Sequence, residues 1–313
     1  MSTWTPQPVA GQPSADVVEQ ILTLATAAGD TDGAAPLSEQ TTLNLRQPGP
    51  VPPVHLVVHD PDGTLVGYAQ LDPGQGDGQV AELVTHPTHR RRGIGRALAR
   101  ALLDTADTAP TGPLRVWAHG DHPSAAALAL DLGFDRVRVL WQLRRRLTDP
   151  VPEPVLPDGV RLRAFRPGED DEAWLRVNRR AFADHPEQGR WTHDDLRVRM
   201  SEPWFDPAGF LLAVDGSTDR LLGFHWTKVH GVAEAPDSSP TDPIGEVYVL
   251  GVDPETHGGG LGRALTLAGL RHLRDRGLSR AMLYVDESNG AAMALYTRLG
   301  FRRWTADVSY QLG

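Results

Sequence analysis

Two stretches of the 313-residue chain are almost copies of each other. They read THPTHRRRGIGRAL, from Thr85 to Leu98, and VDPETHGGGLGRAL, from Val252 to Leu265. Gly93 and Gly260 lie 167 residues apart, and the two LGF triplets further along keep the same spacing. A constant offset over more than forty residues is typical of a duplicated domain rather than of a shared short motif. The chain is therefore predicted to contain two similar domains, which also fits its length.

A proline-rich stretch separates the two repeats. LTDPVPEPVLPDG, at 147–159, has four prolines in thirteen residues and no apolar period, which predicts a stiff linker. We accordingly place an N-terminal domain at 1–149, the linker at 150–159 and a C-terminal domain at 160–313.

Apolar periodicity predicts the same series of elements in both halves. Helices and a hairpin come first, followed by strand, helix, strand, helix and strand. The predicted helices cover residues 14–28, 37–46, about 94 onward, 124–132, 169–182, 193–200, 260 onward and 289 onward. This mixture predicts an α/β (α+β) fold, with a mixed, mostly antiparallel central sheet flanked by helices in each domain.

The composition narrows the possible functions. A formal net charge of −9 and a pI near 5.7 disfavour nucleic acid or an anionic membrane as the main partner, because those surfaces attract basic proteins. The chain shows neither a basic-then-apolar leader nor a bilayer-spanning apolar run, so we expect a cytoplasmic protein. The absence of cysteine excludes disulfides, thiolate metal sites and a cysteine nucleophile. We expect a monomer without a metal.

Lysine is almost missing from this chain. Of its 31 basic residues, Lys228 is the only lysine. Chance survival on a solvated strand is one explanation. The other is a functional need for a compact cation that the planar fork of arginine cannot replace.

Both near-copied stretches place glycines where a strand passes into a helix. This arrangement aims several unpaired N–H groups and the positive end of the helix dipole at one point, which suits a phosphate. Glycine lets the backbone come close to such an anion, although a tight turn without a ligand is the alternative. Neither loop ends in the Gly-Lys-Ser/Thr of a P-loop, and the preceding helices and hairpin disfavour a dinucleotide fingerprint.

The loops resemble the acetyl-CoA loop of the Gcn5-related N-acetyltransferase (GNAT) family, which reads Gln/Arg-x-x-Gly-x-Gly/Ala. RRRGIG, from Arg90 to Gly95, matches it fully, whereas HGGGLG, from His257 to Gly262, begins with histidine. Because backbone amides do most of the binding in such a loop, the histidine bears on how tightly the loop binds acetyl-CoA more than on whether the loop is of this type. The resemblance implies two tandem GNAT domains and acetyl-CoA as the co-substrate.

Two residues of the C-terminal repeat suit the acetyl transfer that this resemblance implies. Glu246 lies on the strand before the glycine loop, and alternation places it with Tyr248 and Leu250 on one face until a bulge intervenes. It is predicted to act as the base, directly or through water. Tyr296 lies about two helical turns after Asn289, where the family uses a tyrosine to protonate the leaving thiolate. A solvated glutamate and a core tyrosine are the alternatives.

The first repeat lacks counterparts of these residues. Subtracting 167 from the positions of the glutamate, asparagine and tyrosine leads to Gln79, His122 and Ala129. Glu82 is an out-of-register candidate base, but no tyrosine accompanies it. The N-terminal domain is therefore predicted to bind acetyl-CoA or to be structural, without catalysing transfer.

Four further segments narrow the resemblance. DGAAPLSEQ, AFADHPEQGRW, LLGFHWTKVH and GEVYVLGVDP are similar to segments of the mycothiol synthase group of this family. That similarity implies acetylation of the cysteinyl amine of 1D-myo-inositol 2-(L-cysteinylamino)-2-deoxy-α-D-glucopyranoside, the last step of mycothiol biosynthesis. It places the substrate contacts at Glu39, Glu187, Lys228, Glu246 and Tyr284. It places the acetyl-CoA contacts at Leu250, Gly251, Val252, His257, Gly258, Gly259, Gly260, Leu261, Gly262, Arg263, Asn289, Gly290, Ala291, Ala292, Met293 and Ala294, and in the first repeat at Leu83, Val84, Thr85, Arg91, Arg92, Gly93, Ile94, Gly95 and Arg96.

Two other functions stay open at this point. The chain could acetylate another amine, such as an aminoglycoside or a peptide amino terminus. It could also bind acetyl-CoA as a sensor or scaffold without catalysis, for which the degenerate first repeat is the supporting feature.

Overall fold

The chain folds into two compact units in a computed structural model. The model describes residues 4–47, 49, 51–74, 78–108, 112–231, 243–256 and 259–312. The first unit comprises Met1–Trp141 together with Thr305–Gly313, and the second comprises Gln142–Trp304.

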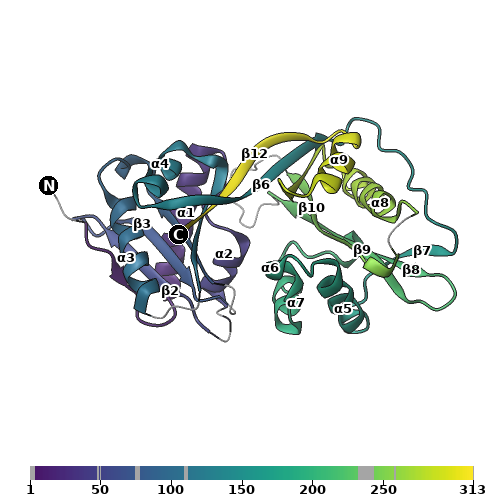
Figure 1. Cartoon of the computed structure of the whole chain (residues 1–313), viewed down its shortest axis with the longest axis horizontal. Coiled ribbons are helices and arrows are strands. Elements are labelled where there is room, and N and C mark those ends of the chain that lie inside the picture. The colour runs from purple at the N-terminus through teal and green to yellow at the C-terminus, as the bar shows by residue number, and fades with distance from the viewer. Residues whose placement is uncertain are drawn as a thin grey trace. The chain divides into compact units, whose positions relative to one another are not determined.

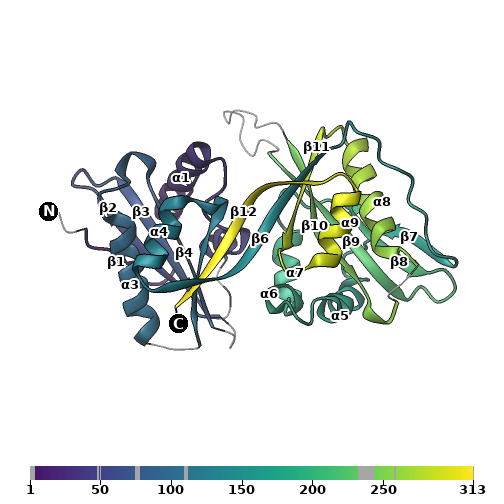
Figure 2. The same ribbon diagram turned by 45° about the horizontal axis from the view of Figure 1, so that its top comes forward.

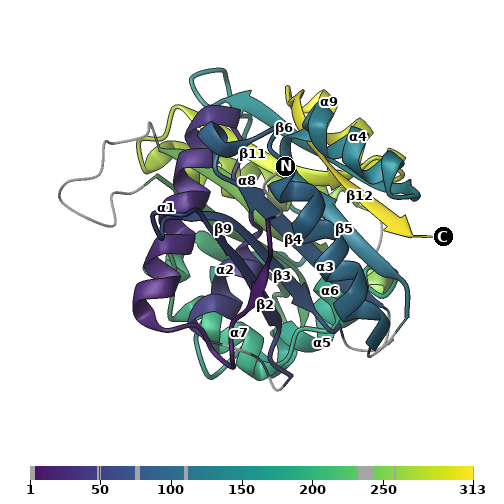
Figure 3. The same ribbon diagram turned by 90° about the vertical axis from the view of Figure 1, so that its left-hand side faces the viewer.

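The first unit is a mixed sheet with helices on both faces. Its elements are β1 (Gln7–Pro8), α1 (Ala15–Asp32), α2 (Glu39–Arg46), β2 (Val54–His59), β3 (Leu65–Asp72), β4 (Gln79–Thr85), α3 (Ile94–Thr108), β5 (Leu114–Ala118), α4 (Pro123–Asp131), the first part of β6 (Phe134–Arg146) and most of β12 (Arg302–Leu312). The strand order is β1, β2, β3, β4, β5 and β12, and only β4 and β5 are parallel among the pairs whose register is described. Figure 3 shows α1 and α2 on one side of these strands, and α3 and α4 on the other.

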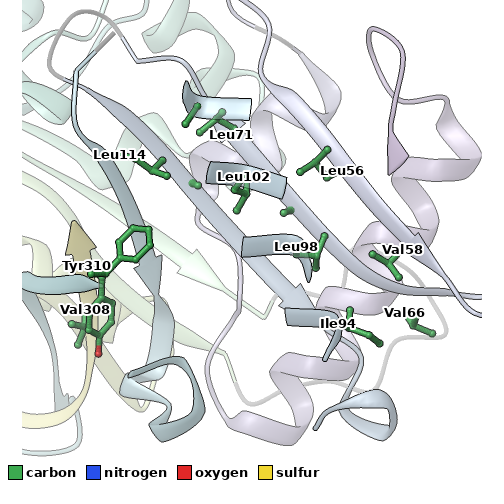
Figure 4. Close-up of a cluster of buried hydrophobic side chains, with 14 residues drawn as sticks. Leu56, Val58, Val66, Leu71, Ile94, Leu98, Leu102, Leu114, Val308 and Tyr310 are labelled. Atoms are coloured by element: carbon green, nitrogen blue, oxygen red, sulfur yellow. The ribbon is translucent and has the colours of Figure 1, made fainter. Parts of the chain in front are cut away.

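The core of this unit follows from the spacing of apolar residues on α3. Ile94, Leu98 and Leu102 recur every four residues, so they line one face of the helix. All three are at most 1% exposed and pack against the strands (Figure 4). Val308 and Tyr310 of β12 belong to the same cluster. The end of the chain is therefore part of the core of the first unit.

The second unit repeats this architecture. Its elements are β7 (Val160–Ala164), α5 (Asp171–Ala181), α6 (Pro186–Gly189), α7 (His193–Met200), β8 (Phe210–Asp215), β9 (Leu221–His230), β10 (Ile244–Val252), α8 (Leu261–Asp275), β11 (Arg280–Asp286) and α9 (Gly290–Arg298), with the ends of β6 and β12 that the first unit leaves out. The strand order is β6, β11, β10, β9, β8 and β7, and β10 and β11 are parallel. In Figure 1, α5, α6 and α7 lie on one side of β9 and β10. α8 and α9 lie on the other side, which Figure 2 brings forward.

The duplicated elements keep the offset seen in the sequence. Helices α3 and α8 have 15 residues each and begin 167 residues apart, at Ile94 and Leu261. Helices α4 and α9 have nine residues each and begin at Pro123 and Gly290, again 167 residues apart. The predicted mixed, mostly antiparallel sheet with flanking helices is confirmed in both units.

The unit boundaries differ from the predicted ranges 1–149, 150–159 and 160–313. Residues 308–311 pair with β5, so the last strand of the chain completes the first unit. The proline-rich stretch contains no helix or strand, but it packs on the second unit. Leu147 and Val151 are buried, and the Val151 carbonyl accepts a hydrogen bond from Arg271 of α8 at 3.1 Å. Sequence composition alone could not show where this stretch would dock.

The first helix is longer than predicted. It continues to Asp32 rather than stopping at Ala28, and Gly33 ends it in the left-handed conformation with φ 72°. The Gly33 N–H bonds the Gly29 carbonyl at 2.8 Å, which satisfies a carbonyl at the helix end. The second helix was predicted at 37–46 and begins at Glu39, behind Ser38, whose hydroxyl accepts from the Thr41 N–H at 3.2 Å.

Candidate active site

The face of the second sheet beneath α5 and α7 carries the predicted base and the only lysine. Trp226 of β9 packs with residues of α5 and α7 in one core cluster. Alternation along β9 places Lys228 and His230 on that same face. Glu246 of β10 lies directly opposite Lys228 in the antiparallel register, so its side chain shares this face.

A β-bulge then separates the predicted residues of β10. Val247 pairs with Thr227, but Val249 already pairs with Trp226. The extra residue turns Leu250 to the opposite face, where it packs against the core cluster that contains Leu261 of α8. The predicted bulge thus comes before Leu250, and Leu250 does not share a face with Glu246.

In the same region, the described pairing between β10 and β11 ends. The register between β10 and β11 covers Gly245–Val247 opposite Ala281–Leu283, while the described part of β10 continues to Val252. Beyond Val247 the edge of β10 that faces β11 carries backbone N–H groups outside this ladder. Such groups need partners when they are buried, so a ligand can bind there.

Glu246 has a partner that sequence reasoning missed. Its carboxylate oxygen Oε2 lies 2.5 Å from Nε2 of His230. Because the ionised carboxylate only accepts, the imidazole nitrogen donates in this pair. The side chain of Glu246 is 9% exposed and that of His230 is 35% exposed, so the predicted alternative of a solvated glutamate is wrong. The position of His230, two residues after Lys228 on the same strand, was the available signal.

Lys228 is not a solvated surface lysine either. It is 8% exposed, and its Nζ lies 4.4 Å from the ring centre of Trp204 and 5.2 Å from that of Tyr248. Ring faces attract such a cation most strongly when it is desolvated. Arg199 of α7 donates to the Tyr248 hydroxyl at 3.0 Å, which holds that ring in place. Lys228 therefore does not lie on a solvated strand, as that alternative supposed.

Tyr296 of α9 is a buried phenol. It is 8% exposed and meets Phe301 edge-on, with 5.7 Å between ring centres. Burial raises the pKa of Tyr296 to about 12, because an apolar surrounding disfavours the phenolate. The hydroxyl therefore keeps its proton at neutral pH. Asn289 caps the same helix, with its side-chain oxygen accepting from the Ala292 N–H at 3.0 Å.

The other predicted substrate contacts are spread over both units. Tyr284 of β11 is 41% exposed, and its hydroxyl accepts from Gln142 Nε2 at 2.7 Å. It lies two residues after Met282, which pairs with Glu246, so it shares the face of Glu246. Glu39 is the half-buried first residue of α2 in the first unit. The side chain of Glu187 lies outside the described residues.

The glycine loop of the second unit has two kinds of glycine. Gly259 and Gly260 have φ of 62° and 77°, a conformation that other residues adopt only with strain. Gly262 has no such φ, and a Cβ there would come no closer than 3.7 Å to Val252. Nothing in the described protein therefore requires glycine at 262, whereas a ligand lying on the backbone would. Predicted residues His257 and Gly258 lie outside the described residues.

The remaining predicted cofactor contacts of this unit lie at the start of α8 and of α9. Leu261 is buried, whereas Arg263 is exposed. At the start of α9, Gly290, Ala291 and Ala294 are exposed, whereas Ala292 and Met293 are half-buried. Gly251 and Val252 end β10, and Gly251 packs on Phe224.

The first unit contains a cavity of about 550 Å³ at its own glycine loop. A pocket of this size suits a small ligand. Gly93, at its rim, has φ 92°. Except for Arg92, all the predicted contacts of this unit line it, namely Leu83, Val84, Thr85, Arg91, Gly93, Ile94, Gly95 and Arg96.

The bulge, the glutamate and the tyrosine of the second unit have no counterparts at the matching described positions of the first unit. The β3–β4 register runs from Gly67 opposite Thr85 to Asp72 opposite Val80 without a shift. Gln79 is buried, and Ala129 lies on α4 in the place of the tyrosine. His122 caps α4, accepting from the Ser124 N–H at 3.2 Å, as Asn289 caps α9.

Glu82 is engaged in a buried ion cluster. His119 Nε2 lies 3.3 Å from its carboxylate, the Ser38 N–H donates to it at 2.7 Å, and His119 Nδ1 lies 2.9 Å from Asp307 of β12. Burial alone would lower the pKa of His119, but attraction to Glu82 and the bond to Asp307 raise it to about 10. Burial alone would raise the pKa of the Glu82 carboxyl, but His119 and Ser38 lower it. Glu82 is thus paired rather than available as a base.

Comparison with known proteins agrees with this geometry. The sequence model of the Acetyltransferase (GNAT) family matches residues 20–134 and 174–301. The chain belongs to the GNAT acetyltransferase family. A protein of Salinispora arenicola named mycothiol acetyltransferase is 66% identical over 94% of this chain and 92% of its own length. Another of that name, from Thermobispora bispora, is 58% identical over 94% and 95%.

Solved structures share the GNAT fold over the whole chain. A tandem GNAT protein from the clavulanic acid biosynthesis pathway has a TM-score of 0.74, with 22% identity, and covers 99% of this chain and 97% of its own. A GCN5-related N-acetyltransferase from Sphaerobacter thermophilus has a TM-score of 0.68, with 24% identity, and covers 97% and 95%. The predicted family, fold class and enzyme class are confirmed, so the chain is a tandem GNAT N-acetyltransferase.

The described residues contain no group of three or more His, Cys, Asp or Glu side chains that could hold a metal ion. Within the same residues, no helix is both long and apolar enough to cross a bilayer.

Proposed function

We propose that the chain transfers the acetyl group of acetyl-CoA to the cysteinyl amine of 1D-myo-inositol 2-(L-cysteinylamino)-2-deoxy-α-D-glucopyranoside, which completes mycothiol. The observation that carries this proposal is the similarity, at 58–66% identity over nearly the whole chain, to proteins named mycothiol acetyltransferase. The buried pairing of Glu246 with His230 beside Lys228 supports it, because it provides a base and a cation for a polar acceptor.

Glu246 is the base in this proposal. An α-amine titrates near about 7.7, so a carboxylate within reach, or one water away, can take the proton that the ammonium loses. The amine nitrogen then attacks the thioester carbonyl, the C–N bond forms and the C–S bond breaks. His230 orients the carboxylate through its 2.5 Å contact. It is a positioning residue for the same step.

Tyr296 is the donor for the leaving thiolate. Its pKa of about 12 keeps it protonated, whereas a thiol titrates near about 8.5. Full proton transfer to a free thiolate would be uphill, so the phenol acts chiefly as a hydrogen-bond donor while negative charge develops on sulfur. The N–H groups of Leu250 to Val252 hold the acetyl carbonyl and the pantetheine arm in this arrangement.

The glycine loops bind the phosphates of acetyl-CoA. In the second unit the start of α8 supplies N–H groups and Gly262 leaves the backbone uncovered. In the first unit the cavity at Gly93 and Gly95 holds a CoA-shaped ligand or is a structural remnant, and transfer does not occur there. In the second unit the acceptor contacts are Glu187, Lys228, Glu246 and Tyr284, and Glu39 of the first unit stays a prediction from the resemblance.

One assay tests the function. The purified chain is incubated with acetyl-CoA and a panel of amines that includes the cysteinyl pseudodisaccharide, an aminoglycoside and a peptide with a free amino terminus. We expect the pseudodisaccharide to be acetylated fastest, and Glu246→Gln to lower its turnover while acetyl-CoA binding stays intact. Preference for another amine would replace the proposed acceptor, and binding of acetyl-CoA without any turnover would favour a sensor.

A further inference from the structure

A row of polar and aromatic side chains extends the catalytic face of the second unit beyond Tyr284. Gln142 of β6 donates to the Tyr284 hydroxyl at 2.7 Å, and its own side-chain oxygen accepts from Arg144 Nε at 2.7 Å. The Arg144 guanidinium carbon lies 4.4 Å from the ring centre of Trp304 on β12. All four residues belong to the second unit. We call Trp304, Arg144, Gln142 and Tyr284 the aromatic row.

The aromatic row lies on the same face as Glu246. Tyr284 shares that face through the register of β11 with β10, and Gln142 reaches Tyr284 directly. Arg144 follows Gln142 by two residues, so it points to the same side of β6. The strand order β10, β11, β6 and β12 therefore arranges the residues in sequence away from the base.

The two aromatic residues of this row are more exposed than aromatic side chains normally are. Trp304 is 62% exposed and Tyr284 is 41% exposed, although aromatic rings normally contribute to a core or an interface. Gln142 between them is only 6% exposed and its amide is held at both ends. Two open ring surfaces joined by a fixed hydrogen-bonding linkage are suited to a ligand with flat C–H faces and hydroxyl edges, such as a cyclic polyol.

The length of the row matches the proposed acceptor. Neighbouring strands are about 4.8 Å apart, so the three strand steps from β10 to β12 span roughly 14 Å across the sheet. An acceptor whose reacting amine lies at Glu246 and whose two rings extend away from it would cover this distance.

We infer that Trp304 and Arg144 form the subsite that holds the sugar–inositol end of the acceptor, with Gln142 and Tyr284 linking them to the catalytic centre. This inference rests on the proposed function. Trp304 offers its ring to the C–H face of the inositol, and the Arg144 fork donates to neighbouring hydroxyls. These residues act in binding rather than in chemistry.

The test compares two acceptors. One is the complete cysteinyl pseudodisaccharide, and the other is cysteinyl glucosamine without the inositol. Trp304→Ala is expected to raise KM for the complete acceptor about tenfold, the loss expected for one good contact. KM for the shortened acceptor and for acetyl-CoA should stay within about twofold of the unmodified chain, and Trp304→Phe should restore most of the affinity.

Arg303→Ala is the matched control. Arg303 is the preceding exposed residue of β12 and points to the opposite face, so its change should leave both acceptors unaffected. Equal effects of Trp304→Ala on both acceptors, or an effect on KM for acetyl-CoA, would overturn the inference. If the unmodified chain does not acetylate the pseudodisaccharide at all, the proposed function itself fails, which is a separate outcome.

Discussion

At the scale of single residues, the contact between His230 and Glu246 is the most informative. The carboxylate is 9% exposed and the imidazole lies 2.5 Å away. His230→Ala removes this partner, and we expect kcat to fall about tenfold or more, as for the loss of a hydrogen bond to a charged group. His230→Gln keeps a donor and should recover part of the rate. Steady-state kinetics check this, and KM for acetyl-CoA should not move. An unchanged kcat in His230→Ala would show that Glu246 needs no positioning.

Tyr296 allows a second prediction at this scale. Its pKa of about 12 means that it stays protonated throughout the range in which the enzyme can be assayed. Tyr296→Phe should lower kcat roughly ten- to a hundredfold, since the leaving thiolate loses its donor. Below about pH 11, the pH–rate profile of the unmodified chain should show no alkaline decline caused by loss of the Tyr296 proton. Tyr296→Phe should therefore leave the shape of the profile unchanged in this range. A decline near pH 9 that the phenylalanine variant lacks would contradict the raised pKa.

At the scale of elements, Gly260 and Gly262 at the start of α8 are expected to have different roles. The first avoids backbone strain, and the second leaves room for a ligand. Gly260 has φ 77°, so Gly260→Ala should destabilise the chain by about 1 kcal/mol. Gly262 has no such restraint and lies inside the helix, where alanine is preferred by about 0.5–1 kcal/mol. Gly262→Ala should therefore retain or raise the melting temperature while raising KM for acetyl-CoA. Loss of stability without a change in KM would point to a packing role instead.

The ion cluster of Glu82, His119 and Asp307 makes the stability of the first unit depend on pH. Attraction to Glu82 and the bond to Asp307 raise the pKa of His119 from its ordinary value of 6.5 to about 10 in the folded unit. Between these values the folded state holds the extra proton, so the contribution is complete below pH 6.5 and is lost as the pH rises toward 10. Amide hydrogen exchange of β5 and β12 at pH 6.5 and pH 9.5, corrected for the intrinsic rate, should show this loss.

Two substitutions make that measurement specific. His119→Gln should flatten the pH dependence in β5 and β12. His193→Gln changes a histidine that is 54% exposed in the second unit, and it should leave the dependence intact. The same slope in all three chains would mean that His119 does not carry the effect.

Patterns within the sequence were sufficient to predict the helices and strands but not the contacts between them. The 167-residue offset predicted the repeated helices, and the helix predicted from 289 onward begins behind its cap, Asn289, because capping depends on local sequence. The β-bulge was expected, but its position before Leu250 depends on cross-strand register, which the periodicity of one strand does not fix. His230 was missed because its role comes from the strand opposite. The place of the last strand in the first unit was missed because it depends on packing between residues far apart in the chain.

At the scale of the whole molecule, duplication has left two glycine loops with different surroundings. The loop that matches the family pattern, RRRGIG, opens a cavity of about 550 Å³ in the first unit, where Glu82 is held by His119. The loop HGGGLG belongs to the unit that contains Glu246 and Tyr296. We therefore expect acetyl-CoA to bind in both units but acetyl transfer to occur only in the second.

Native mass spectrometry with acetyl-CoA tests that separation. We expect up to two acetyl-CoA molecules per chain, and Gly95→Ala should remove one of them while kcat stays within about twofold, because a methyl group there would lie where the phosphate approaches. Gly262→Ala, the matched change in the second unit, should reduce turnover at limiting acetyl-CoA. If Gly95→Ala abolishes turnover in a chain that remains folded, the two units are coupled in catalysis, and the first glycine loop contributes to turnover.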